Sequence, residues 1–357
     1  MKINKWIESV KRVRKGRKTN LPFHRCDFAE RLTNFENDFF NNFIATLKQE
    51  DFITYPSYDD YLSLQLRIGK LFNMKAENVY MTTGSGSCIK DVIQVTCTNN
   101  SEIISTSPCF PMYFVFGETF GAKFIKVQSS SSKEFNYKNY IKNTTDNTRL
   151  VIITNPNSPF GDIRDKKDIE TLCEYYNKLG IVVLIDEAYA DFCNTTSADL
   201  IKKYDNVIIS RTFSKAWGAA GTRVGYLLGN ENLIKLISNV QLTYPITGPS
   251  LKFINYLLDN KEIVKKYVKA SNESRDILIK KLNKANFDVI ESNTNSIHFH
   301  EKKGDNSKVV DILKKHKVAF RSGLRIPQDN RSNWIRMSIG PNIEKTSFIK
   351  ELFNTRQ

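Results

Sequence analysis

The sequence has few of the features that mark membrane, secreted or metal-binding proteins. None of its apolar runs approaches the roughly 18 residues needed to cross a bilayer. Its first residues, Met1 to Trp6, lack the apolar stretch and cleavage site of a signal peptide. The six cysteines form no CxxC pair and show no metal-ligand spacing. We therefore expect a cytoplasmic protein with reduced thiols, no membrane association and no metal site.

Acidic residues are scarce relative to basic ones, and the formal net charge is +15. Such a charge can indicate a nucleic-acid partner. The densest basic cluster, residues 11–18, precedes any recognisable structural element, and much of the excess coincides with an abundance of Lys, Asn and Ile. We interpret the cluster as a solvated arm, with an anionic partner as the alternative; a nucleic-acid partner is not expected. The same positive field would attract phosphorylated substrates.

Short β-branched runs alternate with amphipathic segments through the middle of the chain. This alternation predicts an α/β fold, with a mostly parallel, seven-stranded type of sheet sandwiched between helices. Ligands of such sheets bind at the carboxyl ends of the strands. The expected strands are 79–81, 102–105, 122–127, 150–153, 182–185, 207–209 and 224–228.

The remaining chain predicts a smaller α+β domain. Tyr244 to Pro249 forms a stiff break, after which residues 250–286 are expected to be helical. Further strands are expected at 288–290, 296–299, 318–320 and 334–338, and a helix at 58–72. We predict three parts: an N-terminal arm with part of the small domain (1–50), a large cofactor-binding domain (51–245) and a small C-terminal domain (246–357).

The most informative segment is Arg211-Thr212-Phe213-Ser214-Lys215-Ala216-Trp217-Gly218, with Arg223 eight residues beyond the lysine. A lysine amine can bond covalently to an aldehyde cofactor, while nearby hydroxyls and a guanidinium can hold a phosphate. Upstream, the apolar run 181–185 ends in Asp186, and residues 155–161 read Asn-Pro-Asn-Ser-Pro-Phe-Gly. A carboxylate at the end of a buried strand suits a cationic ring nitrogen.

Together, and in this order, these motifs resemble a fold-type I, pyridoxal 5′-phosphate-dependent class I/II aminotransferase. The resemblance extends from about Tyr55 to Arg336 and is nearest to histidinol-phosphate aminotransferases and their threonine-phosphate decarboxylase relatives. It implies that Lys215 bonds to the cofactor, that Asp186 pairs with the pyridine nitrogen, and that Tyr189 contacts the ring hydroxyl. It further implies a homodimer, because the tyrosine at Tyr55 reaches the phosphate of the neighbouring subunit.

The resemblance assigns the other candidate residues as follows. Phe110 stacks on the pyridine ring, and the phosphate is held by Ser85, Gly86, Thr212, Ser214 and Arg223. Arg336 binds the substrate α-carboxylate and Arg321 assists with a substrate phosphate. The family's asparagine beside the ring hydroxyl is Ser158 here, so either Asn157 takes over that contact or Ser158 makes it. The chain also has Ala29 where relatives place an asparagine near the substrate.

The resulting prediction is an aminotransferase that acts on a small, phosphorylated amino or keto substrate, with an amino donor and a keto acceptor as partners. Lys215 would move a proton at the substrate Cα. One alternative is a decarboxylase of a phosphorylated amino acid such as serine or threonine phosphate. An alternative of another class is a non-catalytic, cofactor-binding protein that associates with nucleic acid through its basic arm.

Overall fold

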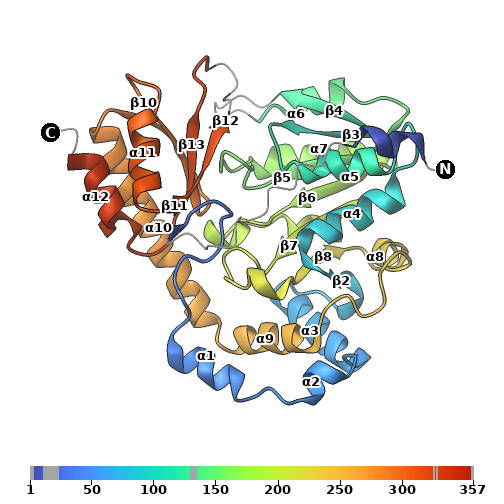
Figure 1. Cartoon of the computed structure of the whole chain (residues 1–357). Coiled ribbons are helices and arrows are strands. Elements are labelled where there is room, and N and C mark those ends of the chain that lie inside the picture. Colours follow the sequence, from blue (N-terminus) through green and yellow to red (C-terminus); the bar gives the residue numbers. More distant parts are fainter. Residues whose placement is uncertain (1–3, 11–23, 129–134, 325, 327–328, 355–357) are drawn as a thin grey trace.

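The computed structural model describes residues 4–10, 24–128, 135–324, 326 and 329–354 (Figure 1). The basic cluster at 11–18 and the serines at 129–132 lie outside these residues. Among the described residues, no helix has the length and apolar character needed to cross a membrane.

The larger sheet has seven strands in the order β2-β8-β7-β6-β5-β3-β4. Five neighbouring strands, from β7 to β4, run parallel, and β8 is antiparallel to both β2 and β7. The strands are β2 (Val79–Thr82), β3 (Glu102–Ser107), β4 (Lys123–Gln128), β5 (Thr148–Thr154), β6 (Val182–Asp186), β7 (Val207–Thr212) and β8 (Gly225–Gly229).

Both faces of this sheet are buried, because alternate residues of each strand enter two different apolar clusters. In β6, for example, Val183 and Ile185 pack into one cluster and Leu184 into the other. Helices α3, α7 and α9 supply the first cluster, and α4, α5 and α8 supply the second. The sheet is therefore a central layer between helices, as the sequence predicted.

Twelve α-helices lie within the described residues. They are α1 (Asn37–Ile44), α2 (Glu50–Ile53), α3 (Tyr58–Leu71), α4 (Gly84–Thr96), α5 (Met112–Thr119), α6 (Tyr137–Lys142), α7 (Lys166–Lys178), α8 (Glu231–Ser238), α9 (Gly248–Asp259), α10 (Lys261–Lys284), α11 (Ser307–Lys315) and α12 (Ser347–Asn354). Local sequence explains several starts: Ser57 and Asp60 form a capping box on α3, and Asp165 caps α7.

A four-stranded antiparallel sheet lies beside the larger one, with α10, α11 and α12 packed on it (Figure 1). Its order is β12-β13-β10-β9, with β9 (Phe287–Ile290), β10 (Ser296–Glu301), β12 (Arg321–Leu324) and β13 (Trp334–Ser338). The N-terminal β1 (His24–Arg25) pairs in parallel with β11 (Val318–Ala319). This pairing attaches the N-terminal segment to the smaller body.

The region 250–286 is helical as expected, although Asn260 divides it into α9 and α10. The start of α4 needs correction: the sequence predicts a Gly/Ser loop ahead of a helix that starts near Cys88, whereas α4 begins at Gly84, so Ser85 and Gly86 belong to its first turn. Gly84 has a φ of +80°, a conformation open to glycine, and this residue turns the chain from β2 directly into the helix.

Candidate active site

The carboxyl ends of neighbouring strands bring several candidate residues to one edge of the larger sheet. Asp186 at the end of β6 is paired in register with Thr154 of β5. Gly225, the first residue of the antiparallel β8, is paired with Thr82 on one side and Thr212 on the other. Loops that leave this edge therefore converge, although they are far apart in the sequence.

Asp186 is almost completely buried and is held by two donors. The hydroxyl of Tyr113 donates to its Oδ2 at 2.5 Å, and the amide of Ala188 donates to its Oδ1 at 3.1 Å. Burial raises the pKa of Asp186, and Tyr113, Ala188 and the charge of Lys215 act in the opposite direction. The carboxylate is thus desolvated, and a cationic group beside it would stabilise its ionised form.

Tyr113 is a member of the site that sequence reasoning missed. It is fully buried in the first turn of α5, and its hydroxyl also lies 3.2 Å from Thr154 Oγ1. In the sequence it looks like one more aromatic residue of an apolar helix. Its spacing of three residues from Phe110, which places both near one helical face, is the only signal that could have marked it.

Lys215 lies in the loop after β7 and is half-buried. Its Nζ donates to the carbonyl oxygen of Phe28 at 2.8 Å and lies 5.5 Å from the centre of the Tyr189 ring. Its charge also lowers the pKa of Asp186, so the two groups interact across the site. The structure therefore brings Lys215, Asp186 and Tyr189 together, as predicted from the sequence.

The N-terminus of α4 and Arg223 form a cradle with little spare room. A Cβ at Gly84 would lie 2.6 Å from Arg223 Nη2, and a Cβ at Gly225 would lie 2.1 Å from the amide nitrogen of Ser85. The two glycines let the guanidinium and β8 approach the first turn of α4. Free amides of a helix N-terminus next to a guanidinium suit a phosphate.

Thr212 and Ser214 complete this part of the site. Both are buried, and the Ser214 amide donates to Thr212 Oγ1 at 3.1 Å.

Phe110, which follows β3, keeps 37% of its surface exposed and meets the Tyr113 ring edge-on, with ring centres 5.6 Å apart. A partly exposed ring beside Tyr113, which itself donates to Asp186, leaves one face available for a flat ligand to stack.

Asn157 and Ser158 differ in how they are engaged. Asn157 is fully buried, and its Nδ2 donates to Asp162 Oδ1 at 2.9 Å within the same loop. Ser158 is half-buried, and its hydroxyl has no hydrogen-bond partner among the described residues.

The side chains of Arg336 and Arg321 both contact the N-terminal segment at Asp27. They lie directly opposite each other on β13 and β12. Arg336 Nη2 donates to the carbonyl oxygen of Asp27 at 3.0 Å, and Arg321 Nε approaches the same oxygen at 3.4 Å while its guanidinium covers the Phe28 ring. Because Lys215 bonds the next carbonyl oxygen, that of Phe28, three cationic groups converge on one short segment.

Tyr55 is not gathered with these residues. It follows α2, keeps 80% of its surface exposed and stacks on Tyr244 with ring centres 5.1 Å apart. Its ring is therefore available to another molecule.

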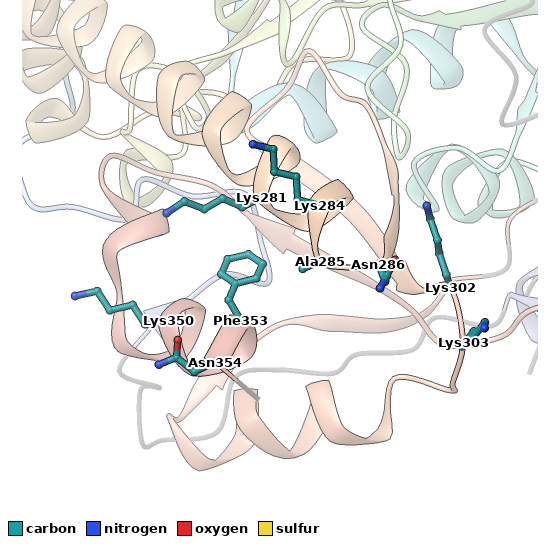
Figure 2. A pocket seen from close by; sticks show the side chains of 9 residues that line it. All are labelled: Lys281, Lys284, Ala285, Asn286, Lys302, Lys303, Lys350, Phe353 and Asn354. Atoms are coloured by element: carbon teal, nitrogen blue, oxygen red, sulfur yellow. The ribbon is translucent and has the colours of Figure 1, made fainter. Parts of the chain in front are cut away.

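A hollow of about 930 Å³ lies elsewhere, between the ends of α10 and α12 (Figure 2). Its lining includes five lysines: Lys281, Lys284, Lys302, Lys303 and Lys350. Figure 2 shows their side chains spread around the hollow and not directed toward one point. Lys281 and Lys284 lie in the last turn of α10, where the helix dipole favours cations, so neither needs a ligand to explain its position.

The site combines a buried anion, a half-exposed aromatic ring, a phosphate cradle and a lysine amine. The comparisons with known proteins agree with this chemistry. Residues 31–349 match the family model described as aminotransferase class I and II. The chain is similar to the histidinol-phosphate aminotransferase of Clostridium novyi, with 27% identity over 331 residues, 91% of this chain and 90% of that protein.

Two solved structures share the fold at low sequence identity. One is histidinol-phosphate aminotransferase from Sinorhizobium meliloti in complex with pyridoxal-5′-phosphate, with a TM-score of 0.80, 16% identity, and coverage of 94% of this chain and 92% of that one. The other is L-threonine-O-3-phosphate decarboxylase from Porphyromonas gingivalis, with a TM-score of 0.76, 16% identity, and coverage of 93% and 99%.

Proposed function

Since this chain belongs to the class I and II aminotransferases and is a pyridoxal phosphate-dependent transaminase, we propose that Lys215, Asp186 and Tyr189 are its catalytic groups. The convergence of the Lys215 amine and the buried Asp186 carboxylate carries this proposal. When bound, pyridoxal phosphate supplies an aldehyde that bonds to amines and a ring that accepts electrons from the substrate Cα.

Asp186 holds the ring nitrogen in its protonated state. A desolvated carboxylate gains most from a cation beside it, and Tyr113 and Ala188 keep its two oxygens in place. The phosphate is held by the first turn of α4 together with Arg223 and Ser214. These two anchors would hold the cofactor at its ring nitrogen and at its phosphate, and Phe110 would be the residue to stack on the ring.

Lys215 has two tasks in the proposed reaction. Its amine would hold the cofactor before substrate arrives, and once released it would take the proton from the substrate Cα. The carbonyl oxygen of Phe28, which accepts from Nζ at 2.8 Å, offers the amine a resting position when it is released.

For the ring hydroxyl we propose Tyr189 and Ser158 as the two partners. The Asn157 amide is already used to hold its loop through Asp162, whereas the Ser158 hydroxyl is free to donate. Because the serine side chain is shorter than that of the family's asparagine, Ser158 would make a weaker contact.

The substrate side is defined by Arg336 and Arg321. We propose that Arg336 grips the α-carboxylate and that Arg321 binds a second anionic group, because two guanidiniums side by side match a substrate with two anions. The similarity to histidinol-phosphate aminotransferases supports a phosphate as the second anion. The substrate class is thus a small phosphorylated amino or keto compound, with Arg336 free to bind the carboxylate of whichever partner carries one.

We also propose that the enzyme is a homodimer with shared sites. An exposed apolar stripe runs along α3 through Tyr58, Leu62 and Leu66, which are spaced four residues apart and therefore share one face. Exposed Leu242 and the stacked pair of Tyr55 and Tyr244 extend this surface. A second copy that covered it would bring Tyr55 into the partner's phosphate cradle.

Cytoplasmic placement remains part of the proposal. All six cysteines are free in the structure, and five are buried. Burial raises the pKa of the thiols, for example that of Cys173 to about 12, so they are suited to packing in a reducing compartment and not to disulfide exchange.

The test of the proposed function is a product screen. Holoenzyme is incubated with L-glutamate and a panel of phosphorylated ketones, and 2-oxoglutarate and new phosphorylated amines are followed by mass spectrometry. The proposal predicts that both form in equal amounts. Release of carbon dioxide from serine or threonine phosphate, without formation of a keto acid, would instead identify a decarboxylase.

A further inference from the structure

A row of three polar side chains crosses the four-stranded sheet beside the candidate active site. Arg336 of β13 is paired in register with Arg321 of β12 on one side and with His298 of β10 on the other. Residues directly opposite each other in antiparallel strands project from the same face, so the three side chains are neighbours. His298 has no role in the reaction described above.

His298 and Arg336 each have a buried polar atom without a partner. His298 is fully buried, and neither of its ring nitrogens has a hydrogen-bond partner among the described residues. The same holds for Nε of Arg336. His300, two residues further along the same face, has both ring nitrogens within hydrogen-bond distance of a carbonyl oxygen, that of Glu301 at 2.7 Å and that of Ser332 at 3.1 Å. Unpaired nitrogens are therefore not a general property of this strand.

The chemistry of the two groups is complementary. Burial lowers the pKa of His298 to about 3, and the charge of Arg336 contributes, so the imidazole is neutral at physiological pH. A neutral imidazole has one acceptor nitrogen, whereas an arginine has only donors. The ring of Phe160, from the loop after β5, lies 6.1 Å from the His298 ring and limits its movement on that side.

We propose that His298 is the positioning residue for Arg336: when substrate binds, its acceptor nitrogen takes the hydrogen of Nε, which is unpaired in this structure, and thereby directs the two Nη groups toward the substrate carboxylate. This inference rests on the proposed function, in which Arg336 binds that carboxylate. A guanidinium held at Nε presents a fixed two-pronged fork, while a free one can turn back to the Asp27 carbonyl oxygen, where Nη2 now donates.

The test compares holoenzyme variants in binding glutarate, a dicarboxylate that cannot react, and in the half-reaction with L-glutamate. His298→Leu removes the acceptor, and we expect the dissociation constant for glutarate and the apparent one for L-glutamate to rise about tenfold, while the maximal half-reaction rate stays within about twofold. His298→Gln keeps an acceptor and is expected to restore most of the affinity. His300→Leu is the matched control, since it removes a hydrogen-bonding imidazole two residues away and should lower the melting temperature without weakening glutarate binding.

The outcomes separate this inference from the proposed function. If Arg336→Ala weakens glutarate binding but His298→Leu does not, the positioning role is wrong and the carboxylate role stands. Equal weakening by His298→Leu and His300→Leu would also overturn it, because a general loss of packing would then explain both. If the wild-type enzyme binds no glutarate, or if Arg336→Ala leaves binding intact, the assignment of Arg336 fails and the inference fails with it.

Discussion

Burial of Asp186 favours its neutral form, whereas its proposed pairing with the cofactor requires the ionised form. Its carboxylate is enclosed at the end of β6, and burial raises its pKa above the ordinary value of 3.8. The native apoprotein therefore holds this proton at pH values where the unfolded chain has already released it. By linkage, the contribution of Asp186 to apoprotein stability falls as the pH rises from 3.8 through the raised native pKa.

Replacement of Asp186 by Asn should remove this pH dependence. We expect the melting temperature of the wild-type apoprotein to fall relative to that of Asp186→Asn as the pH rises from the ordinary carboxylate pKa toward neutrality. Scanning calorimetry of both apoproteins over that range measures the difference. A constant difference would show that the buried carboxylate does not titrate as described.

Tyr113 should act on the cofactor through Asp186. In Tyr113→Phe the carboxylate loses its donor at 2.5 Å, its pKa rises further, and the ionised form that pairs with the cofactor becomes less available. We expect pyridoxal phosphate to bind about tenfold more weakly, in line with the loss of one hydrogen bond to a charged group.

Tyr176→Phe is the control for this change. Tyr176 is also fully buried, and its hydroxyl lies 2.9 Å from Thr144 Oγ1. Loss of that bond should lower the free energy of unfolding by about 1 kcal/mol and leave cofactor affinity unchanged. Equal losses of affinity in both variants would mean that Tyr113 acts only through stability.

The sequence motifs predict Lys215 and Asp186 as site residues, and the structure places them close enough for the charge of Lys215 to lower the pKa of Asp186; their roles stay predictions. Sequence reasoning could not find Tyr113 or His298, because a tyrosine in an apolar helix and a histidine in a short strand look like ordinary buried residues. What distinguishes them is a partner 73 residues away in one case, and a neighbouring strand in the other.

The conformation of the loop between β5 and α7 depends on Gly161. Gly161 has a φ of +86°, and a Cβ there would lie 1.9 Å from Ser292 Oγ. Its carbonyl oxygen also accepts the amide of Asn293 at 2.8 Å. This glycine therefore fixes the loop that carries Asn157 and Ser158 against the small sheet.

We expect Gly161→Ala to lower the free energy of unfolding by at least about 3 kcal/mol, from left-handed strain together with the clash, and to weaken cofactor binding. Gly180→Ala is the control, because Gly180 has a φ of +66° but nothing within 4 Å of an added Cβ. It should cost about 1 kcal/mol, without an effect on the cofactor. Chemical denaturation and cofactor titration of both variants test the difference; similar losses in the two would contradict it.

Element boundaries were predicted where the local pattern was strong. The β-branched runs located every strand of the larger sheet, and the capping box of Ser57 explains why α3 begins at Tyr58, where the sequence placed it. The start of α4 was missed because Gly84 and Gly86 read as a loop. The packing of Gly225 against Ser85, which holds the helix start in place, is not visible in a local window.

At the scale of the whole molecule, the exposed face of α3 and the distance of Tyr55 from the other candidates have one explanation, the proposed dimer. A mixture of Lys215→Ala and Tyr55→Ala subunits tests it. If Tyr55 serves the partner, each hybrid dimer has one intact site, and random reassociation should restore about a quarter of wild-type activity. If Tyr55 serves its own subunit, the mixture stays as inactive as its parents; if it serves neither site, Tyr55→Ala alone keeps wild-type activity.

The fold class was predictable because the alternation of apolar runs is a property of the whole chain. The strand order was not: β8 enters between β2 and β7, and the N-terminal β1 pairs with β11, almost three hundred residues later. Such pairings depend on long-range packing. The division into two domains stays a prediction, consistent with two separate sheets beside each other (Figure 1).

The central claim is that Lys215 holds the cofactor, and it can be tested by chemical trapping. Holoenzyme is reduced with borohydride, digested, and analysed by mass spectrometry for the lysine that carries the pyridoxyl group. We predict a single modified peptide, residues 212–223, with the label on Lys215 and none in Lys215→Ala. A label on another lysine, or an unlabelled Lys215 at saturating pyridoxal phosphate, would contradict the account.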